Sequence, residues 1–152
     1  MKELKNYITE AFKINKNTKL ERRYKYFPAT KEELKAIIEQ RIKSEGNKCD
    51  LNDIDVSKIT DMSYLFLRSD FNGDISKWDV SNVINMCEMF RFSKFNGDIS
   101  KWDVSNVKYM ISMFFASEFN QDISKWNVSN IIYYDDVFYN CKIEQKYKPK
   151  FK

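Results

Sequence analysis

Apolar and polar positions recur along the middle of the chain with a fixed period of 24 residues. The segment FNGDISKWDVSNV begins at Phe71 and returns unchanged at Phe95, and a close copy, FNQDISKWNVSNI, begins at Phe119. Residues 47–70 form a weaker first copy. A period of this length indicates a repeat protein in which neighbouring units bury their apolar faces against one another.

Each unit has apolar residues at the same places, so the repeats predict columns of stacked side chains. These columns include Leu51, Ile75, Ile99 and Ile123; Ile54, Trp78, Trp102 and Trp126; and Phe66, Phe90, Phe114 and Phe138. Such a column predicts that each side chain packs on its copy in the next unit, which makes the columns the expected core. The Trp column accepts Ile54, and this favours core over an exposed platform for bases or sugars.

Two patterns follow one another within a unit. The segment DISKWDV mixes β-branched, aromatic and polar residues, which is typical of a short strand. From Val83 onward, Met86, Met89 and Phe90 continue one apolar face with helical spacing, and Ser81 stands where a helix N-cap would lie. Each unit is therefore predicted to be a short strand, a tight turn and a short helix. Its length is typical of leucine-rich repeats.

The N-terminal part has a different pattern. Thr30 followed by Glu33 is a capping box that predicts a helix opening at KEELKAIIEQ, and Gly46 is its predicted stop. A second amphipathic helix is expected near residues 2–14. Two such helices would give the first coil the polar outer surface that a repeat stack needs at its end.

These patterns predict an α/β repeat fold: a leucine-rich-repeat-like, right-handed solenoid of four 24-residue strand–turn–helix coils with an N-terminal helical cap. The predicted cap is 1–46, the solenoid is 47–142, and a basic C-terminal tail follows at 143–152. The four coils are 47–70, 71–94, 95–118 and 119–142.

The composition argues against an enzyme. The chain has no His, which excludes Ser–His and Cys–His nucleophile pairs and His-ligated metals, so we expect no catalytic residue and no cofactor. Its three cysteines, Cys49, Cys87 and Cys141, are too few and too widely spaced for a disulfide framework. The chain shows neither a secretory apolar region at its start nor an apolar run of membrane-spanning length. We therefore expect a cytoplasmic protein with free thiols and no membrane partner.

Basic residues concentrate at the two ends of the chain. Residues 1–46 contain 12 basic and 7 acidic side chains, whereas residues 47–142 contain 10 and 14. Basic residues interleaved with aromatic ones are typical of nucleic-acid-binding surfaces. The N-terminal part contains one such stretch, and its candidate nucleic-acid-binding residues are Lys19, Arg22, Arg23, Tyr24 and Lys25. Because Glu21 interrupts the stretch, nucleic-acid binding is an alternative and not the leading function.

Acidic residues also form a column, made of Asp50, Asp74, Asp98 and Asp122. Stacked carboxylates are able to hold Ca²⁺ between coils. The other interpretation is that these side chains accept hydrogen bonds from backbone N–H groups at turns in a glycine-poor chain. The spacing of a calcium-binding loop is absent, so we favour the turns and expect no metal.

The positions that differ between repeats separate the expected surface from the expected scaffold. They lie on and beside the predicted helix and are rich in Tyr, Phe and Arg, which are enriched at the energetic centres of protein interfaces. We predict that the partner-binding residues are Tyr64, Arg68, Arg91, Phe92, Lys108, Tyr109, Phe115, Tyr133 and Tyr139. For Phe92 and Phe115, the alternative is that they fill gaps between helix ends and the next strand.

The repeats resemble the BspA-like leucine-rich-repeat family, also described as the bacterial surface protein repeat. The resemblance rests on FNGDISKWDVSNV followed by spaced Met residues and Met-Phe at 71–90 and 95–114, with looser copies at 119–138 and 47–66. It covers about residues 47–142. It implies a binding solenoid without catalytic residues, like those of adhesins, lipoproteins and binding modules of bacteria, their phages and some protists.

We therefore expect a non-enzymatic protein–protein interaction module of a bacterium or its phage, which binds through the variable helical face of the solenoid. One form of this function is an inhibitor that occupies and blocks a host protein. The alternatives are a surface adhesin or virion structural component, and nucleic-acid binding through the basic cap.

Overall fold

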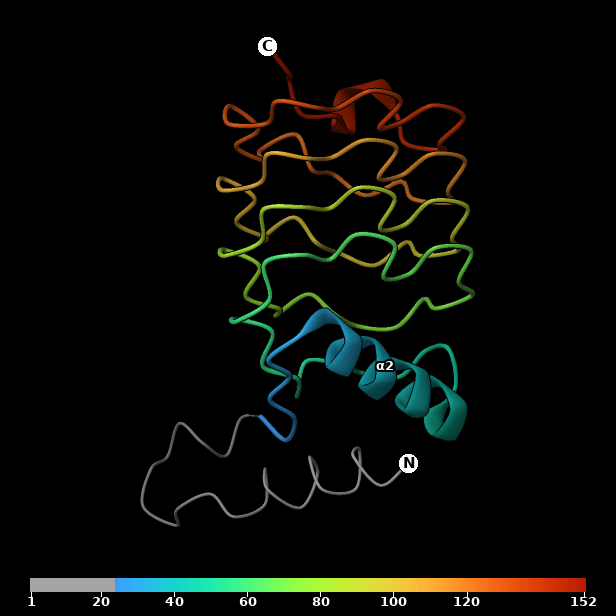
Figure 1. Ribbon diagram of the computed structural model, residues 1–152. Helices are drawn as coiled ribbons and strands as arrows, with labels where there is room; N and C mark the ends of the chain where they lie inside the picture. The colour runs from blue at the N-terminus through green and yellow to red at the C-terminus, as the bar shows by residue number, and fades with distance from the viewer. Residues whose placement is uncertain (1–23) are drawn as a thin grey trace.

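The computed structural model describes residues 24–152. Over this range the chain winds into a stack of coils, with helix α2 (Lys31–Glu45) at one end and the 3₁₀ helix η1 (Gln145–Tyr147) at the other (Figure 1). These two helices are the only regular elements in the described part of the chain. The helix predicted near residues 2–14 lies outside the described residues.

Helix α2 forms as the capping pattern predicts. Thr30 Oγ1 accepts a hydrogen bond from the backbone N–H of Glu33 at 3.2 Å, and the Glu33 carboxylate accepts one from the N–H of Ala29 at 2.7 Å. Gly46 follows the helix with a φ of 88°, and its N–H donates to the carbonyl of Ile42. Because a positive φ favours glycine, the helix ends where the sequence indicates. This prediction is confirmed.

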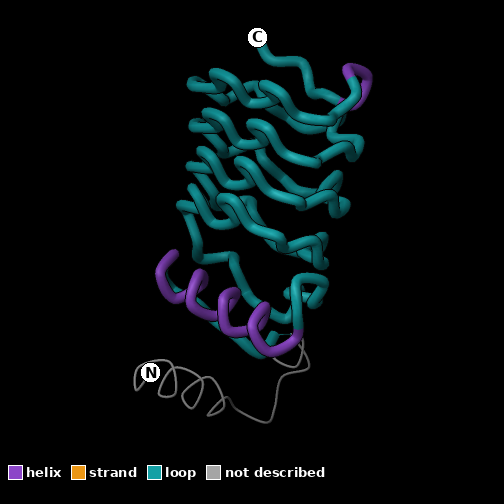
Figure 2. Tube along the Cα trace, turned by 90° about the vertical axis from the view of Figure 1, so that its right-hand side faces the viewer, coloured by secondary structure: helices purple, strands orange, loops and turns teal. Residues whose placement is uncertain are grey.

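The predicted strand–turn–helix coils are wrong. The repeats contain no helix and no continuous strand, and the only β-type pairing between their coils is a set of isolated parallel bridges (Figure 2). These bridges join Asp50 to Asp74, Asp61 to Asn85, Asn85 to Tyr109, and Tyr109 to Tyr133. The described chain is therefore not an α/β solenoid of the leucine-rich-repeat type. It is a stack of irregular coils built from turns.

Two left-handed residues in each coil are the reason that no helix forms. In the first coil, residues 62–65 and 66–69 are two turns, each closed by a hydrogen bond from its last N–H to its first carbonyl. The third residue of each turn has a positive φ, 62° at Tyr64 and 54° at Arg68, as in a type II turn. A helix needs a negative φ at every residue. The same two places have a positive φ in the later coils, at Glu88 and Phe92, Ser112 and Ala116, and Asp136 and Asn140.

Backbone hydrogen bonds join these segments of turns into a ladder that runs from coil to coil. The N–H groups of Met62, Tyr64, Phe66 and Arg68 donate to carbonyls of the second coil at 2.8 to 3.0 Å. The next two junctions repeat this pattern, beginning at Met86 and at Met110. The ladder therefore satisfies the buried backbone groups that a regular sheet or helix would otherwise pair.

Asp and Asn side chains stabilise the remaining turns. Oδ1 of Asp74 accepts a hydrogen bond from the N–H of Ser76 at 2.9 Å, and the same bond recurs in the next two coils. Oδ1 of Asn72 accepts one from the N–H of Asn96, across the junction between coils, at 2.9 Å. These contacts support the interpretation of the Asp column as a series of Asx turns. They also explain how the chain turns so often with few glycines.

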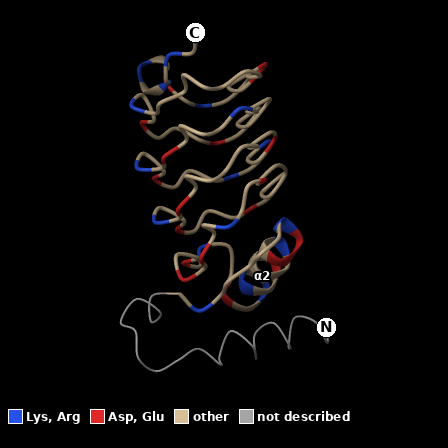
Figure 3. Cartoon of the chain, turned by 60° about the vertical axis from the view of Figure 1, so that its left-hand side comes forward, with Lys and Arg blue, Asp and Glu red and all other residues tan. Residues whose placement is uncertain are grey.

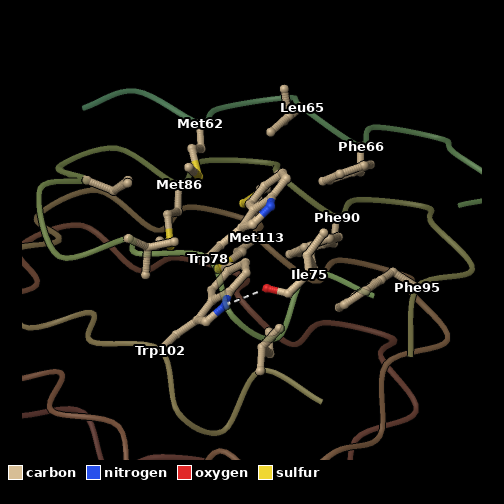
Figure 4. Close-up of a cluster of buried hydrophobic side chains, with 14 of the residues drawn as sticks. Met62, Leu65, Phe66, Ile75, Trp78, Met86, Phe90, Phe95, Trp102 and Met113 are labelled. Atoms are coloured by element: carbon tan, nitrogen blue, oxygen red, sulfur yellow. Dashed lines mark hydrogen bonds between the residues drawn. The ribbon is translucent and has the colours of Figure 1, made fainter. Parts of the chain in front are cut away.

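Stacked aromatic columns fill the interior (Figure 4). The rings of Phe66 and Phe90 lie nearly parallel at 5.4 Å between centroids, and Phe90 and Phe114 repeat this contact at 5.5 Å. Trp102 is only 4% exposed, and its Nε1 donates to the carbonyl of Ile75 at 3.1 Å. Because the indole N–H has a partner, the Trp column belongs to the core without a polar penalty. The predicted core columns are confirmed, and the last Phe is half-buried.

Arg41 attaches helix α2 to the first coil. Its guanidinium donates to the Asp53 carboxylate at 2.7 Å and to the backbone carbonyl of Asp50 at 2.9 Å, and it also pairs with Glu45. Burial alone would lower the pKa of Arg41, but hydrogen bonds to Glu45 and Asp53 outweigh it and raise the pKa above its ordinary value. A charge that is both buried and paired holds α2 against this end of the stack.

Residues after the fourth repeat continue the stack at the other end. Ile143 is buried, and the carbonyl of Tyr147 accepts a hydrogen bond from the N–H of Ile123 at 3.1 Å. The ring of Phe151 stacks on that of Tyr134 at 4.7 Å. These contacts cover part of the fourth coil, whereas α2 covers the first.

Candidate functional site

One stretch of each coil, which we call the variable segment, contains all the predicted partner-binding residues. The variable segments are 60–68, 84–92, 108–116 and 132–140. The backbone ladder joins them side by side, so residues that differ between repeats line up across neighbouring coils. The predicted helical face is therefore a face built from turns.

Five of the predicted residues form one contact network, the arginine–phenylalanine cluster: Arg68, Arg91, Phe92, Phe115 and Tyr139. The guanidinium of Arg68 lies 4.7 Å from the centroid of the Phe92 ring. That of Arg91 lies over both Phe92 and Phe115, at 5.1 and 4.7 Å. Phe115 contacts Phe92 edge-on at 5.6 Å and stacks on Tyr139 at 5.1 Å. These are the distances of cation–π and aromatic pairs.

This cluster crosses all four coils and remains open to solvent. Tyr139 is 62% exposed and Phe92 is 38% exposed, while Phe115 is half-buried between its neighbours. The exposure of Phe92 argues against a gap-filling role for this residue. Arg91 pairs with Glu88 at 2.9 Å, and its Nε has no hydrogen-bond partner among residues 24–152. The Glu88 carboxylate and the two ring faces together hold the guanidinium in place.

Tyr109 and Tyr133 form a second cluster, the tyrosine pair. Their rings are almost parallel at 5.6 Å between centroids, and they are 38% and 49% exposed. Ile84 and Ile132, 40% and 58% exposed, add apolar surface to the same segments and are missing from the predicted binding residues. The sequence could have identified both residues, because they occupy the same repeat position as Lys108, which is exposed and is among the predicted binding residues.

Tyr64 lies beside helix α2, away from the arginine–phenylalanine cluster. Its ring is 48% exposed, and the ammonium of Lys31 lies 5.6 Å from its centroid. Lys31 also donates to Ser63 Oγ at 2.6 Å and pairs with Asp61 at 3.4 Å. This predicted residue therefore marks the junction between the cap and the first coil.

The structure describes only part of the predicted nucleic-acid surface. Lys19, Arg22 and Arg23 lie outside the described residues. Lys25 pairs with the Asp53 carboxylate at 3.3 Å, and the ring of Tyr24 contacts Phe27 edge-on. The contact with Asp53 offsets positive charge that phosphate binding would use.

The described residues show little reactive chemistry. Cys49, Cys87 and Cys141 are free thiols, and burial raises the pKa of Cys49 and Cys87, which lowers their reactive thiolate fraction. From residue 24 onward, no group of three or more His, Cys, Asp or Glu side chains is placed to hold a metal ion. The same part of the chain has no helix with the length and apolar character of a membrane span.

The stacked coils and their variable segments together define the class: a repeat protein whose coils share one core and differ from one another on one exposed side. The chain belongs to the family described as "Mycoplasma protein of unknown function, DUF285", whose family model matches residues 33–150. The match includes most of α2, all four repeats and most of the C-terminal segment. No curated protein and no solved structure matches the chain.

Proposed function

We propose that the chain is a non-enzymatic protein–protein interaction module that binds a partner protein through the arginine–phenylalanine cluster. The observation that carries this proposal is the contiguity of the cluster, in which two guanidinium groups and three rings contact one another across four coils. Aromatic and Arg side chains dominate the binding energy of protein interfaces. Because these side chains already hold one another in place, binding would cost them little conformational entropy.

The backbone beneath the cluster is left-handed at two of its residues. Arg68 and Phe92 have φ values of 54° and 55°, in the left-handed region that glycine adopts most easily. A bulky side chain in this conformation costs about 1–2 kcal/mol. Residues that keep such a conformation often belong to functional sites. The same two places are left-handed in every coil, so the repeated turns impose this conformation, and the Arg68 guanidinium and the Phe92 ring that stand there contact each other.

The proposal also includes the setting of the protein. The family description names Mycoplasma, which supports a bacterium or one of its phages as the source. Free, partly buried thiols suit the reducing cytoplasm, which we propose as the compartment. Inhibition of a host protein remains one form of the function. A surface adhesin or virion component would use the same face, and the identity of the captured partner would distinguish these roles.

Affinity capture from a lysate of the source bacterium tests the proposal. The variant Phe115→Ser/Tyr139→Ser removes two rings of the cluster and should weaken capture of the partner by at least about tenfold, the effect of losing an interface hot spot. The control variant Lys77→Ser/Lys101→Ser changes two exposed residues outside the variable segments and should capture the partner as the wild type does. A cooperative melting transition above the temperature of the capture experiment would show that the fold of each variant is intact.

A second arm tests the tyrosine pair. Tyr109→Ala/Tyr133→Ala should weaken capture less than the cluster variant does, because the pair lacks the contacts to Arg68 and Arg91. Undiminished capture by Phe115→Ser/Tyr139→Ser would contradict the proposed site. If the wild type captures no protein at all, the interaction function itself is wrong.

A further inference from the structure

Within the turns of each variable segment, the N–H groups of the ladder all donate to the following coil, whereas donation to the preceding coil occurs at the start of the segment, as from Ile84 to the carbonyl of Thr60. At the third junction, the N–H groups of Met110, Ser112, Phe114 and Ala116 donate to carbonyls of the fourth coil. The equivalent N–H groups of the fourth coil, at Tyr134, Asp136, Phe138 and Asn140, have no backbone acceptor among the described residues. The carbonyls of Asp136 and Phe138 accept hydrogen bonds inside turns. This edge therefore offers a row of donors, whose partial positive charge favours acceptor groups.

The C-terminal segment, residues 146–152, which begins within η1, adds positive charge at the same end of the stack (Figure 3). Apolar and basic residues alternate along it. Tyr147, Pro149 and Phe151 are buried or half-buried, and Phe151 packs against the stack. The alternate residues, Lys146, Lys148, Lys150 and Lys152, line a cleft of about 780 Å³ against Trp126 and Val128 of the fourth coil.

The cleft has no acidic residue in its lining. Lys146 pairs with Glu144 at 2.9 Å, and Lys148 donates to the Gln145 side chain at 3.2 Å. Lys148, Lys150 and Lys152 make no ion pair with any described residue. The ammonium of Lys148 also lies 5.6 Å from the centroid of the Phe138 ring. Three lysines without an ion pair therefore line one cleft, at the end of the stack where the donor edge lies.

The spacing of these lysines favours an extended peptide as the ligand. Alternate residues of an extended chain lie roughly 6.6 Å apart, so carboxylates at every second position of an extended peptide match lysines at every second position here. A single-stranded nucleic acid would need exposed aromatic faces on which its bases stack. Trp126 is only 6% exposed, and Tyr147 and Phe151 are half-buried.

We propose that the C-terminal end of the stack binds an acidic, extended segment of a partner protein, with its carboxylates on Lys148, Lys150 and Lys152. The unpaired N–H groups of the fourth coil strengthen the attraction for acceptors. This site is separate from the arginine–phenylalanine cluster, and it does not rest on the function proposed for that cluster. Asp135 and Asp136, both exposed, oppose the ligand and limit its affinity.

Fluorescence anisotropy with a short labelled peptide of alternating Glu and Ser tests this site in the full chain. The variant Lys148→Gln/Lys150→Gln/Lys152→Gln should bind the peptide about tenfold more weakly than the wild type, because three charge contacts are lost. The control Lys35→Gln/Lys77→Gln/Lys101→Gln removes the same charge from exposed positions elsewhere and should change the dissociation constant by less than about twofold. Asp135→Asn/Asp136→Asn should tighten binding.

Three results would overturn the proposal. The first is an equal loss of affinity in the tail variant and in the control, which would show a general charge effect. The second is tighter binding of a single-stranded oligonucleotide of equal charge than of the peptide, which would identify a nucleic-acid site. The third is the absence of peptide binding by the wild type at low salt. Unchanged circular dichroism of each variant would confirm that the fold is retained.

Discussion

Phe90 and Phe92 are two residues apart, yet they lie in different environments. Phe90 is fully buried and stacks between Phe66 and Phe114, whereas Phe92 is 38% exposed and contacts two guanidinium groups. Every coil has Phe at the place of Phe90, while Arg68 and Ala116 stand at the place of Phe92. Within one chain, therefore, an unchanged column marks the shared core and a changing column marks a surface that is free to serve binding.

The largest difference between the buried core columns and the variable face should appear in the free energy of unfolding. Phe90→Ala leaves a cavity in the stacked column and should lower the free energy of unfolding by about 3–5 kcal/mol. Phe115→Ala removes a ring of equal size from the half-buried face and should cost no more than about half of that, because its site is open to solvent. Urea unfolding measures both values. Equal losses would remove the distinction between core and face.

A substitution in the Trp column should lower the free energy of unfolding by less than Phe90→Ala does. Trp102→Phe keeps an aromatic ring but removes the N–H that donates to the carbonyl of Ile75 at 3.1 Å. The carbonyl of Ile75 keeps the hydrogen bond from the backbone N–H of Trp78 at 3.2 Å, so the substitution removes one of two bonds and should cost about 0.5–1.5 kcal/mol. The urea midpoint reports this loss. A change below about 0.5 kcal/mol would mean that the hydrogen bond contributes nothing to the core.

The Asx turns should make stability depend on pH. The backbone N–H of Ser100 and then its side chain hold the pKa of Asp98 below its ordinary value, and the side chain and N–H of Ser105 do the same for Asp103. A folded pKa below the unfolded pKa stabilises the protein above the unfolded value, and this contribution disappears as the pH falls through the folded value. The urea midpoint should therefore decrease below about pH 5.

The variant Asp98→Asn/Asp103→Asn provides the comparison for this pH effect. Asn keeps an acceptor for the turn but does not titrate, so the decrease in urea midpoint at acid pH should be shallower than in the wild type. An unchanged slope would show that these two turns do not contribute to acid sensitivity.

The smallest predicted effect concerns the left-handed positions. Ala116 has a φ of 50°, so Ala116→Gly relieves about 1–2 kcal/mol of strain and loses about 0.5–1 kcal/mol through backbone entropy. The variant should be more stable than the wild type by up to about 1.5 kcal/mol. Ala36→Gly, inside helix α2, is the matched control and should be destabilised by about 1 kcal/mol. Destabilisation by both substitutions would contradict the turn geometry.

The sequence predicts the core of this fold better than its local structure. The period and the apolar columns identify buried residues such as Phe90 and Trp102, because stacking depends only on which residues recur. The coil conformation is not predicted, because successive four-residue turns bring side chains inward with the same spacing as a helix. Phe92 and Glu88 adopt left-handed conformations without the glycine that would have signalled them.

The candidate site is predicted as a set of residues but not as an arrangement. Variation between repeats identifies Arg68, Phe92 and Tyr139 as surface residues. It does not show that Arg91 lies between two rings, because that contact depends on how the turns align neighbouring coils. The donor edge of the fourth coil also has no sequence signal, since it arises from the direction of the backbone ladder.

Site-specific photo-cross-linking in cells of the source organism tests the central claim most directly, namely that the variable face binds a protein while the repeated columns only hold the fold. A photoreactive phenylalanine analogue at Tyr139, 62% exposed in the arginine–phenylalanine cluster, should cross-link one predominant protein. The same analogue at Lys77, exposed outside the variable segments, should not cross-link that protein. Identical products from both positions, or no product from Tyr139, would contradict the account.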